Sequence, residues 1–204
     1  QRTRGHAIES IATYSEALSV LENINDDPAM LETLSQLSSL TLETDNPQAA
    51  ALYSARGANV ADKLSNDAQQ INLLMILGDA RQELGENKDA ARAYQRGLDV
   101  ARTAGDSANE ALLLYKLGYA YLDDSEPETA VKTWEDALIL FRKQNRRDYE
   151  GRVLGGLGAA NSDLERWAEA TNFYTSALYI AREVKDKEDE LLQLSNLGYA
   201  AVRS

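Results

Sequence analysis

The tetrapeptide Leu-Gly-x-Ala recurs along the chain at a constant interval. Its copies are at residues 77–80, 117–120, 157–160 and 197–200. Another leucine stands three residues before each copy, and three of the copies are followed at a fixed distance by an aromatic residue, at Tyr94, Trp134 and Tyr174. So many residues that recur at the same interval indicate a repeat protein, in which similar units stack on their neighbours.

The shared residues of each unit have helical spacing. We count unit positions from residues 31, 71, 111 and 151, which places leucines at positions 4 and 7 of every unit and glycine at position 8 of the last three, where the first has Ser38. Spacings of three and four put these residues on one face of a helix. Glycine in a helix costs about 1 kcal/mol relative to alanine, so its recurrence indicates close approach of a second helix. Small residues at positions 20 and 27 flank the aromatic at position 24 and predict the matching face of that second helix.

The sequence therefore predicts an all-α solenoid of stacked antiparallel helix pairs. The helices are expected at residues 6–24, 28–43, 47–65, 67–83, 87–103, 107–122, 126–144, 147–162, 165–185 and 188–203. We expect one solenoid over residues 1–204, with a half repeat at 6–27, repeats at 31–70, 71–110, 111–150 and 151–190, and a half repeat at 191–204. The chain starts at Gln1 without a methionine, and we expect it to be a piece of a longer protein.

Capping residues support these boundaries. Asn46 precedes Pro47, which suits a cap followed by the first helical residue. Residues 107–110 and 125–128 have the order expected of capping boxes. Gly85 and Gly105 follow helical runs and predict helix C-termini.

The columns resemble the tetratricopeptide repeat, whose pattern has a large residue at position 4, Leu at 7, Gly at 8, Ala at 20, an aromatic at 24 and Ala at 27. The resemblance covers residues 31–203, and the 40-residue period is similar to that of kinesin light chains. Position 32 departs from the short repeat, because arginine replaces its proline at Arg102, Arg142 and Arg182. The resemblance implies a right-handed superhelix whose first helices line a concave groove.

Positions 2, 5, 9 and 12 of the first helices would then face the groove. The candidate binding residues at these positions, with Asn196 beside them, are Asn72, Met75, Asp79, Leu112, Tyr115, Tyr119, Leu122, Arg152, Asn196 and Tyr199. Four of them form a hydrophobic and aromatic stripe in the third repeat, which predicts a contact surface open to water. The alternative is that the curved solenoid buries this stripe between repeats. Small residues beside it, such as Gly155 and Ala159, could leave a pocket for a partner side chain.

Arginines at position 32 and glutamates at position 40 recur together, at Arg102, Arg142 and Arg182 and at Glu110, Glu150 and Glu190. Structural ion pairing across the turn between repeats is the favoured interpretation, and a ladder that binds anions is the alternative. The acidic run at residues 186–190 is interpreted as a solvated turn without fixed geometry.

Nothing in the sequence predicts catalysis, a cofactor or a metal site. There is no cysteine, and His6 is the single histidine, near one end of the chain. The glycine-rich run at 155–158 lacks a preceding strand and a Walker lysine, and Gly158 belongs to the packing column. We therefore expect a protein that is not an enzyme.

The charge balance points to the kind of partner. The chain has 33 acidic and 21 basic residues and a formal net charge of -12, which disfavours nucleic acid and anionic peptides. We expect a protein or peptide partner with basic and apolar residues, no membrane contact, and possible homodimers through the solenoid ends. The predicted function is a scaffold that binds a peptide or helix in the groove. The alternative is the sensor or dimerisation arm of a larger bacterial regulatory or signalling protein, and the expected compartment is the cytoplasm.

Overall fold

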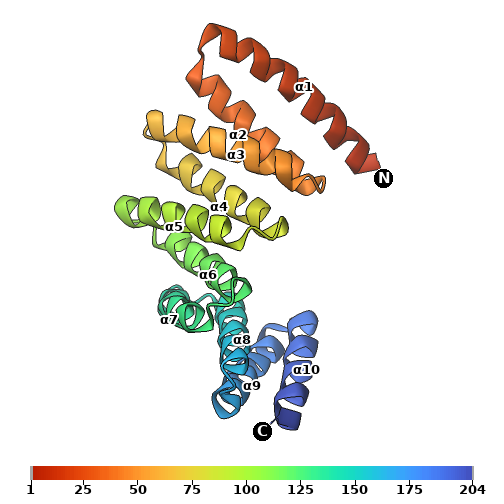
Figure 1. The fold of residues 1–204 in the computed structure, drawn as a ribbon, viewed down its shortest axis with the longest axis vertical. Helices are drawn as coiled ribbons and strands as arrows, with labels where there is room; N and C mark the ends of the chain where they lie inside the picture. Colours follow the sequence, from red (N-terminus) through yellow and green to blue (C-terminus); the bar gives the residue numbers. More distant parts are fainter. Residues whose placement is uncertain (1, 204) are drawn as a thin grey trace. The chain divides into compact units, whose positions relative to one another are not determined.

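The computed structural model describes residues 2–203, and this part of the chain forms ten α-helices and no strand (Figure 1). The helices are α1 Arg2–Ile24, α2 Asp27–Glu43, α3 Pro47–Lys63, α4 Asp67–Glu83, α5 Asn87–Ala104, α6 Ser107–Asp123, α7 Pro127–Lys143, α8 Arg147–Asp163, α9 Trp167–Val184 and α10 Lys187–Arg203. The predicted boundaries agree to within two residues, except that α1 begins four residues earlier than expected.

The turns between helices repeat as regularly as the helices. Every turn has a residue with positive φ at the same point, namely Asn25, Asp45, Ser65, Gly85, Gly105, Ser125, Asn145, Glu165 and Lys185. This left-handed conformation suits glycine best, and it ends a helix by turning the chain back. Gly85 and Gly105, with φ of 72° and 69°, confirm the predicted helix C-termini.

One predicted cap is confirmed and two are wrong. The Asn46 side chain accepts a hydrogen bond from the amide of Ala49 at 3.1 Å, immediately before Pro47 begins α3. Ser125 is the left-handed turn residue instead of a cap, and Glu126 precedes α7 without a capping side-chain hydrogen bond. Ser107 is the first residue inside α6, so residues 107–110 do not form the predicted capping box.

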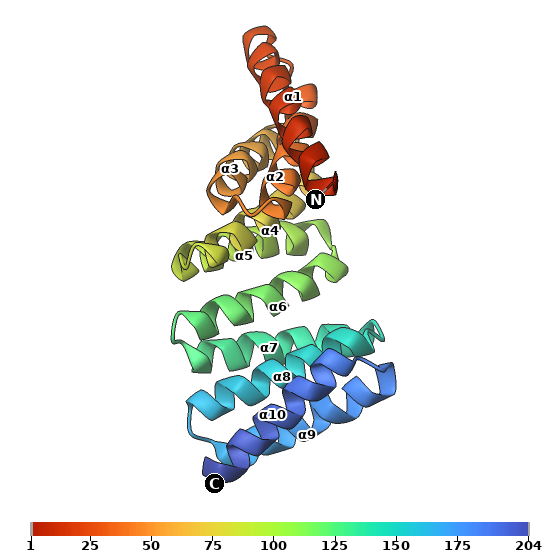
Figure 2. The same ribbon diagram turned by 90° about the vertical axis from the view of Figure 1, so that its right-hand side faces the viewer.

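The chain packs as two compact units, which are divided between Asp106 and Ser107. In the first unit, each of α1 to α4 packs against the next helix. In the second unit, each of α6 to α9 does the same, and neighbouring helices lie side by side (Figure 2). Both units confirm the predicted all-α solenoid architecture of stacked antiparallel helix pairs. A single solenoid over residues 1–204, with the repeat boundaries given above, stays a prediction.

The glycines at position 8 lie where paired helices approach each other most closely. A Cβ built on Gly78 would lie 2.6 Å from Cζ of Tyr94. A Cβ on Gly118 would lie 2.6 Å from Cδ1 of Trp134, and one on Gly158 would lie 2.5 Å from Cδ1 of Tyr174. These aromatic rings are the position-24 residues, and all three are buried. The recurrent glycine is therefore required by packing, as the sequence predicted.

The first repeat keeps the same contact faces, but serines replace the glycine and the aromatic residue. Ser38 stands in the glycine column and Ser54 in the aromatic column, and both are fully buried. Each hydroxyl donates to a carbonyl one helical turn earlier, of Leu34 and Ala50, at 2.6 Å. Buried hydroxyls satisfied within their own helix carry little penalty, which explains how this repeat diverges without losing its fold.

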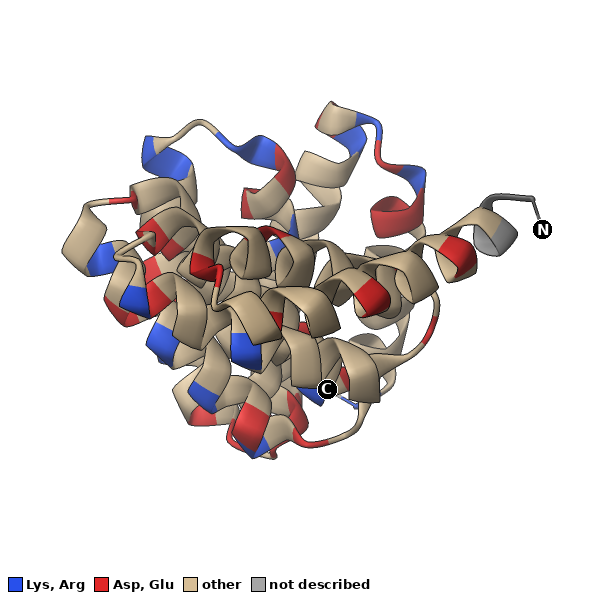
Figure 3. Cartoon of the chain, turned by 90° about the horizontal axis from the view of Figure 1, so that it is seen from above, with Lys and Arg blue, Asp and Glu red and all other residues tan. Residues whose placement is uncertain are grey.

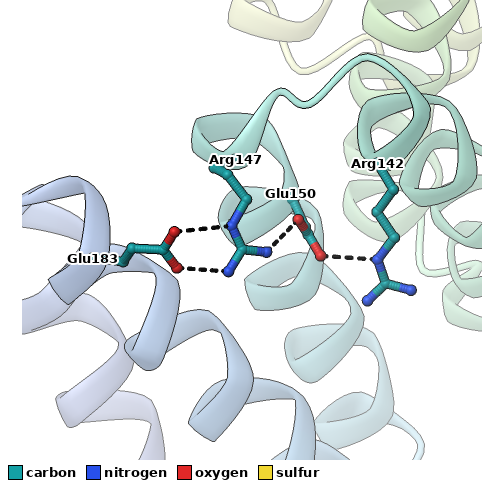
Figure 4. Close-up of polar contacts among 4 residues, drawn as sticks. All are labelled: Arg142, Arg147, Glu150 and Glu183. Atoms are coloured by element: carbon teal, nitrogen blue, oxygen red, sulfur yellow. Dashed lines mark hydrogen bonds and ion pairs between the residues drawn. The ribbon is translucent and has the colours of Figure 1, made fainter.

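The arginine and glutamate columns form ion pairs across the turn between repeats. Arg142 Nε donates to Glu150 Oε1 at 2.8 Å, and Arg182 Nε donates to Glu190 Oε1 at 2.9 Å. Figure 4 shows that the first pair is extended, since Arg147 bridges Glu150 and Glu183. These contacts confirm structural ion pairing in both places.

Replacing Glu150 with glutamine is expected to lower the free energy of unfolding by about 1–2 kcal/mol at neutral pH, because the amide has no negative charge and only one oxygen to accept from the two arginines. Burial alone would raise the pKa of the Glu150 carboxyl, but hydrogen bonds from Arg142 and Arg147 outweigh it and hold the pKa below its ordinary 4.5. The stabilisation is therefore complete above the unfolded-state pKa and disappears as the pH falls through the lower folded-state pKa.

Denaturant unfolding of the wild type and Glu150→Gln between pH 7 and pH values below 4.5 measures this difference. The two proteins should converge in stability as the pH falls. Glu135 is an exposed residue of α7 and supplies the control, because Glu135→Gln should change stability little at any pH. A Glu150→Gln effect that does not vary with pH would contradict a role for the charge.

Candidate functional site

The second unit contains a groove of about 560 Å³ formed by α6, α8 and α10. These are first helices of successive repeats, the class of helix that the family resemblance assigns to a concave surface. The groove is lined by Tyr115, Tyr119, Arg152, Gly155, Gly156, Ala159, Asp186, Glu188, Asp189, Leu192, Gln193 and Asn196.

The floor of the groove consists of small residues of α8. Gly155 and Gly156 are buried and Ala159 is half-buried. A Cβ on Gly155 would lie 2.7 Å from Nε2 of Gln193, and one on Gly156 would lie 2.9 Å from the Trp134 ring. The absent side chains allow neighbouring groups to approach α8, and they also leave the open volume of the groove.

Two tyrosines form one wall. The rings of Tyr115 and Tyr119 meet edge to face with centroids 5.1 Å apart. Tyr119 also packs edge to face on Trp134 at 4.9 Å, and Tyr115 packs on Tyr149 at 5.3 Å. Both tyrosines are half-buried, so the stripe is less open to water than the sequence predicted, although both residues line the groove. The cause is that each large ring leans into the aromatic cluster of the next helices instead of pointing outward.

Burial raises the pKa of the Tyr119 hydroxyl, and the neighbouring Tyr115 raises it further. Tyr119 is therefore uncharged throughout the range in which proteins stay folded. It can offer the groove a hydrogen-bonding hydroxyl and an apolar ring, but no charge.

The rim is acidic. Asp186, Glu188 and Asp189 contribute three carboxyl groups near the start of α10, and Arg152 contributes one guanidinium group. Arg152 Nη2 lies 3.8 Å from Asp186 Oδ2. Elsewhere in the described chain, acidic and basic positions are interspersed along the helices and turns (Figure 3). The groove rim thus has a local excess of negative charge, which favours cationic groups.

Residues 186–190 have a defined geometry, which corrects their interpretation as a solvated turn. The Asp186 carboxylate accepts a hydrogen bond from the amide of Asp189 at 3.0 Å, at the start of α10. Glu190 pairs with Arg182 and Lys187 at 2.9 and 2.7 Å. The helix terminus holds these carboxylates in place and so positions the acidic rim.

Gln193 is the most unusual side chain of the groove. It is 1% exposed, and its Nε2 donates to Asp189 Oδ1 at 2.8 Å. A carboxylate only accepts hydrogen bonds at neutral pH, so this contact fixes which amide atom faces Asp189. The amide oxygen Oε1 has no partner, and among the side chains of residues 6–203 it is the single buried nitrogen or oxygen in that state.

The predicted site residues fall into three places. Tyr115, Tyr119, Arg152 and Asn196 come together in the groove. Leu112 and Leu122 lie half-buried on the same helix as the tyrosines without lining it, and Tyr199 is 54% exposed and packs against Trp167. The other three, Asn72, Met75 and Asp79, belong to α4 of the first unit, where Asp79 accepts a hydrogen bond from the Tyr94 hydroxyl at 2.6 Å.

Residues 109–183 match the family model described as the tetratricopeptide repeat. Over these residues the chain is similar to the tetratricopeptide repeat family. Solved structures share the fold of these repeats at low sequence identity. The nearly identical TPR-like repeats of a kinesin light chain from Podosopora anserina align with a TM-score of 0.74 and 14% identity, over 89% of this chain and 90% of that one. No curated protein matches the sequence.

In two further structures of similar fold, the region that aligns with this chain is only part of a longer chain. A STAND signal transduction ATPase with a tetratricopeptide repeat sensor, from Pyrococcus horikoshii, aligns with a TM-score of 0.78 and 16% identity, over 97% of this chain and 32% of that one. A Rap protein complexed with competence and sporulation factor aligns with a TM-score of 0.72 and 15% identity, over 97% of this chain and 58% of that one.

Neither a membrane-spanning helix nor a metal-ligating cluster occurs in the part of the chain that the structure describes. Within residues 2–203, no helix combines the length and apolar character needed to cross a membrane. Across the same residues, no group of three or more His, Cys, Asp or Glu side chains is arranged to hold a metal ion.

Proposed function

We propose that this tetratricopeptide repeat chain is a protein-interaction scaffold, and that the groove of the second unit binds an extended segment of a partner protein. The unpaired Oε1 of Gln193 carries this proposal. A buried acceptor without a partner costs about 1–3 kcal/mol, and native proteins seldom retain one without a reason. An N–H donor that enters the groove beside Gln193 supplies the missing hydrogen bond.

The charge and shape of the groove favour a basic and partly apolar segment. Asp186, Glu188 and Asp189 outnumber Arg152, whose Nη2 lies 3.8 Å from Asp186, so the rim attracts lysine or arginine side chains. Leu192 is 55% exposed at the groove and offers apolar area beside the tyrosines. Asn196 can hydrogen-bond a peptide backbone. The overall charge of -12 adds long-range attraction for a basic partner, which should weaken as salt rises.

The relatives support a binding role without defining the ligand. The Rap structure is a complex with competence and sporulation factor, so this fold accommodates a bound partner in that protein. The second candidate function is a sensor arm of a larger signalling protein. It is favoured by the Pyrococcus horikoshii structure, in which a similar repeat array is named as the sensor of an ATPase. An effector domain in the full-length gene product would support this candidate.

Substituting Gln193 with methionine is expected to weaken binding of a basic, apolar peptide about tenfold, which corresponds to one lost hydrogen bond of about 1.4 kcal/mol. Methionine keeps the unbranched shape that packs on Gly155. The unfolding temperature should change little, because loss of the Asp189 hydrogen bond is offset by removal of the unpaired carbonyl. Calorimetry with peptides selected from matched basic and acidic libraries, at two salt concentrations, measures the binding.

Gln70 provides a matched control in the first unit. It is 6% exposed, and its Nε2 donates to Asp62 Oδ1 at 3.2 Å, but no atom of its amide is left buried without a partner. Gln70→Met should lower stability and leave peptide binding unchanged. A preference for acidic peptides, or equal binding by wild type and Gln193→Met, would refute the proposed groove.

A further inference from the structure

The groove contains two neighbouring hydrogen-bond acceptors, the amide oxygen of Gln193 and the carboxylate of Asp189. The Gln193 amide joins them, because its nitrogen donates to Asp189 Oδ1 while its oxygen has no partner. Both side chains face α8: Gln193 Oε1 would lie 3.4 Å from a Cβ on Gly155, and Asp189 Oδ2 would lie 3.8 Å from a Cβ on Gly151. Packing on α8 therefore places the two acceptors, and a single group with several donors can reach both.

Asp189 is the carboxylate of the groove that remains for a ligand. Asp186 already accepts a hydrogen bond from the amide of Asp189 and lies 3.8 Å from Arg152 Nη2. Glu188 is exposed on the rim, where water screens its charge. Asp189 is half-buried, and no arginine or lysine among the described side chains forms an ion pair with it. Its negative charge is thus less screened than that of Glu188.

The tyrosine wall stands beside this carboxylate. Burial is the main reason why the pKa of the Tyr119 hydroxyl is raised, followed by Tyr115, and the Asp189 carboxylate raises it as well. Asp189 of α10 and Tyr119 of α6 are therefore neighbours across the groove. The rings of Tyr115 and Tyr119 stand at 83° to each other. An aromatic ring beside a carboxylate attracts a cation from two directions.

The second unit uses this combination for one of its own arginines. The guanidinium of Arg146 lies 4.5 Å from the centroid of the Tyr149 ring, and its Nε and Nη2 donate to Asp148 at 3.1 and 2.9 Å. A guanidinium is planar, stacks on aromatic rings and is weakly hydrated, whereas an ammonium is a compact and strongly hydrated charge. A half-buried site of tyrosine rings and acceptors suits the guanidinium better.

We propose that Tyr115, Tyr119, Asp189 and Gln193 form a subsite that selects an arginine of the partner segment over a lysine. This inference rests on the proposed function of the groove. The planar guanidinium donates to the Asp189 carboxylate and to Gln193 Oε1 at the same time, while its face lies against the tyrosine wall. A lysine ammonium can reach the same acceptors, but it does not stack and it loses more hydration on entry.

The tightest-binding peptide of the basic library tests this selectivity when it is made in three versions. Every basic residue is arginine in the first version, lysine in the second and citrulline, the uncharged analogue of arginine, in the third. The arginine version should bind at least about fivefold more tightly than the lysine version, and the citrulline version about tenfold more weakly than the arginine version. Calorimetry at constant salt measures all three, and the series needs no altered protein.

Two protein variants then locate the selectivity. Gln193→Met should weaken the arginine version about tenfold and the lysine version less than about twofold, so that the preference disappears. Asp189→Asn keeps the shape of the side chain and should weaken both versions, because it removes the charge. Glu135→Gln supplies the control, since it changes the net charge equally on an exposed part of α7 and should leave both affinities unchanged. Thermal unfolding verifies that each variant is folded.

Failure of the arginine subsite is distinct from failure of the groove. Equal binding of the arginine and lysine versions, both still weakened by Asp189→Asn, would overturn the subsite and leave the groove as a general site for cations. An arginine preference that persists in Gln193→Met would place the guanidinium elsewhere and would also overturn the subsite. A library that yields no basic peptide, or prefers acidic peptides, would overturn the proposed groove together with the subsite.

Discussion

Gly118→Leu should lower the free energy of unfolding by at least about 3 kcal/mol, at the upper end of the cost of overpacking a core. Even the first added carbon would lie 2.6 Å from Cδ1 of Trp134 and closer still to its ring nitrogen. The indole cannot retreat cheaply, because it is fully buried and its Nε1 donates to the carbonyl of Tyr115 at 3.0 Å. Denaturant unfolding followed by circular dichroism measures the loss.

The same column provides the control for this substitution. Gly198→Leu adds an identical side chain to the equivalent residue of α10, where nothing lies within 4 Å. It should leave stability unchanged or raise it by up to about 1 kcal/mol, since glycine is a poor helix former. Equal effects of the two substitutions would show that close approach is not the reason for the glycine column.

The double substitution Tyr115→Ala with Tyr119→Ala should also be strongly destabilising, by about 3 kcal/mol or more. Aromatic residues in cores cost about 3–5 kcal/mol each when truncated, and these two are half-buried. Their rings join Trp134 and Tyr149 in one cluster of edge-to-face contacts. Thermal and denaturant unfolding of the double variant measures the loss, and any fall in peptide binding by this protein would reflect folding as well as contact.

Two further variants test whether the loss of stability comes from the buried aromatic rings of Tyr115 and Tyr119. Tyr179→Ala removes a tyrosine that is 68% exposed, and it should change stability by no more than about 0.5 kcal/mol. Replacing both groove tyrosines with phenylalanine retains the ring contacts and should keep most of the stability. A double alanine variant as stable as the wild type would show that the two tyrosines are a surface stripe after all.

The fold was predictable because its determinants recur. Four copies of the position-7 leucine and position-8 glycine define one helix face, and the position-24 aromatics define the face that meets it. The burial of Tyr115 and Tyr119 was not predictable in the same way. Periodicity tells which side of a helix a residue occupies, but the depth of a large ring depends on the residues of neighbouring helices, such as Trp134 and Tyr149.

The place of Gln193 in the repeat could have drawn attention to it from the sequence alone, but it is not among the predicted site residues. It stands at position 3, where Leu73, Leu113 and Val153 are fully buried and Thr33 of the divergent first repeat is the other polar residue, so a long polar side chain at this position is an exception. The exception identifies a residue worth inspection. It does not reveal that Asp189 takes the amide nitrogen and leaves the oxygen unpaired, because that depends on how one side chain is oriented at the start of α10.

The even spacing of the left-handed turn residues limits how a chain built from such repeats can change in length. Their even spacing from Asn25 to Lys185 means that each helix and its turn occupy a module of constant size. Duplication or deletion of one complete helix pair returns every glycine to an aromatic partner. An insertion of one residue within a helix rotates all that follows on that helix by about 100° and turns its packing face away from its neighbour. Inheritance of whole modules is thus the route by which such a chain lengthens without losing its core.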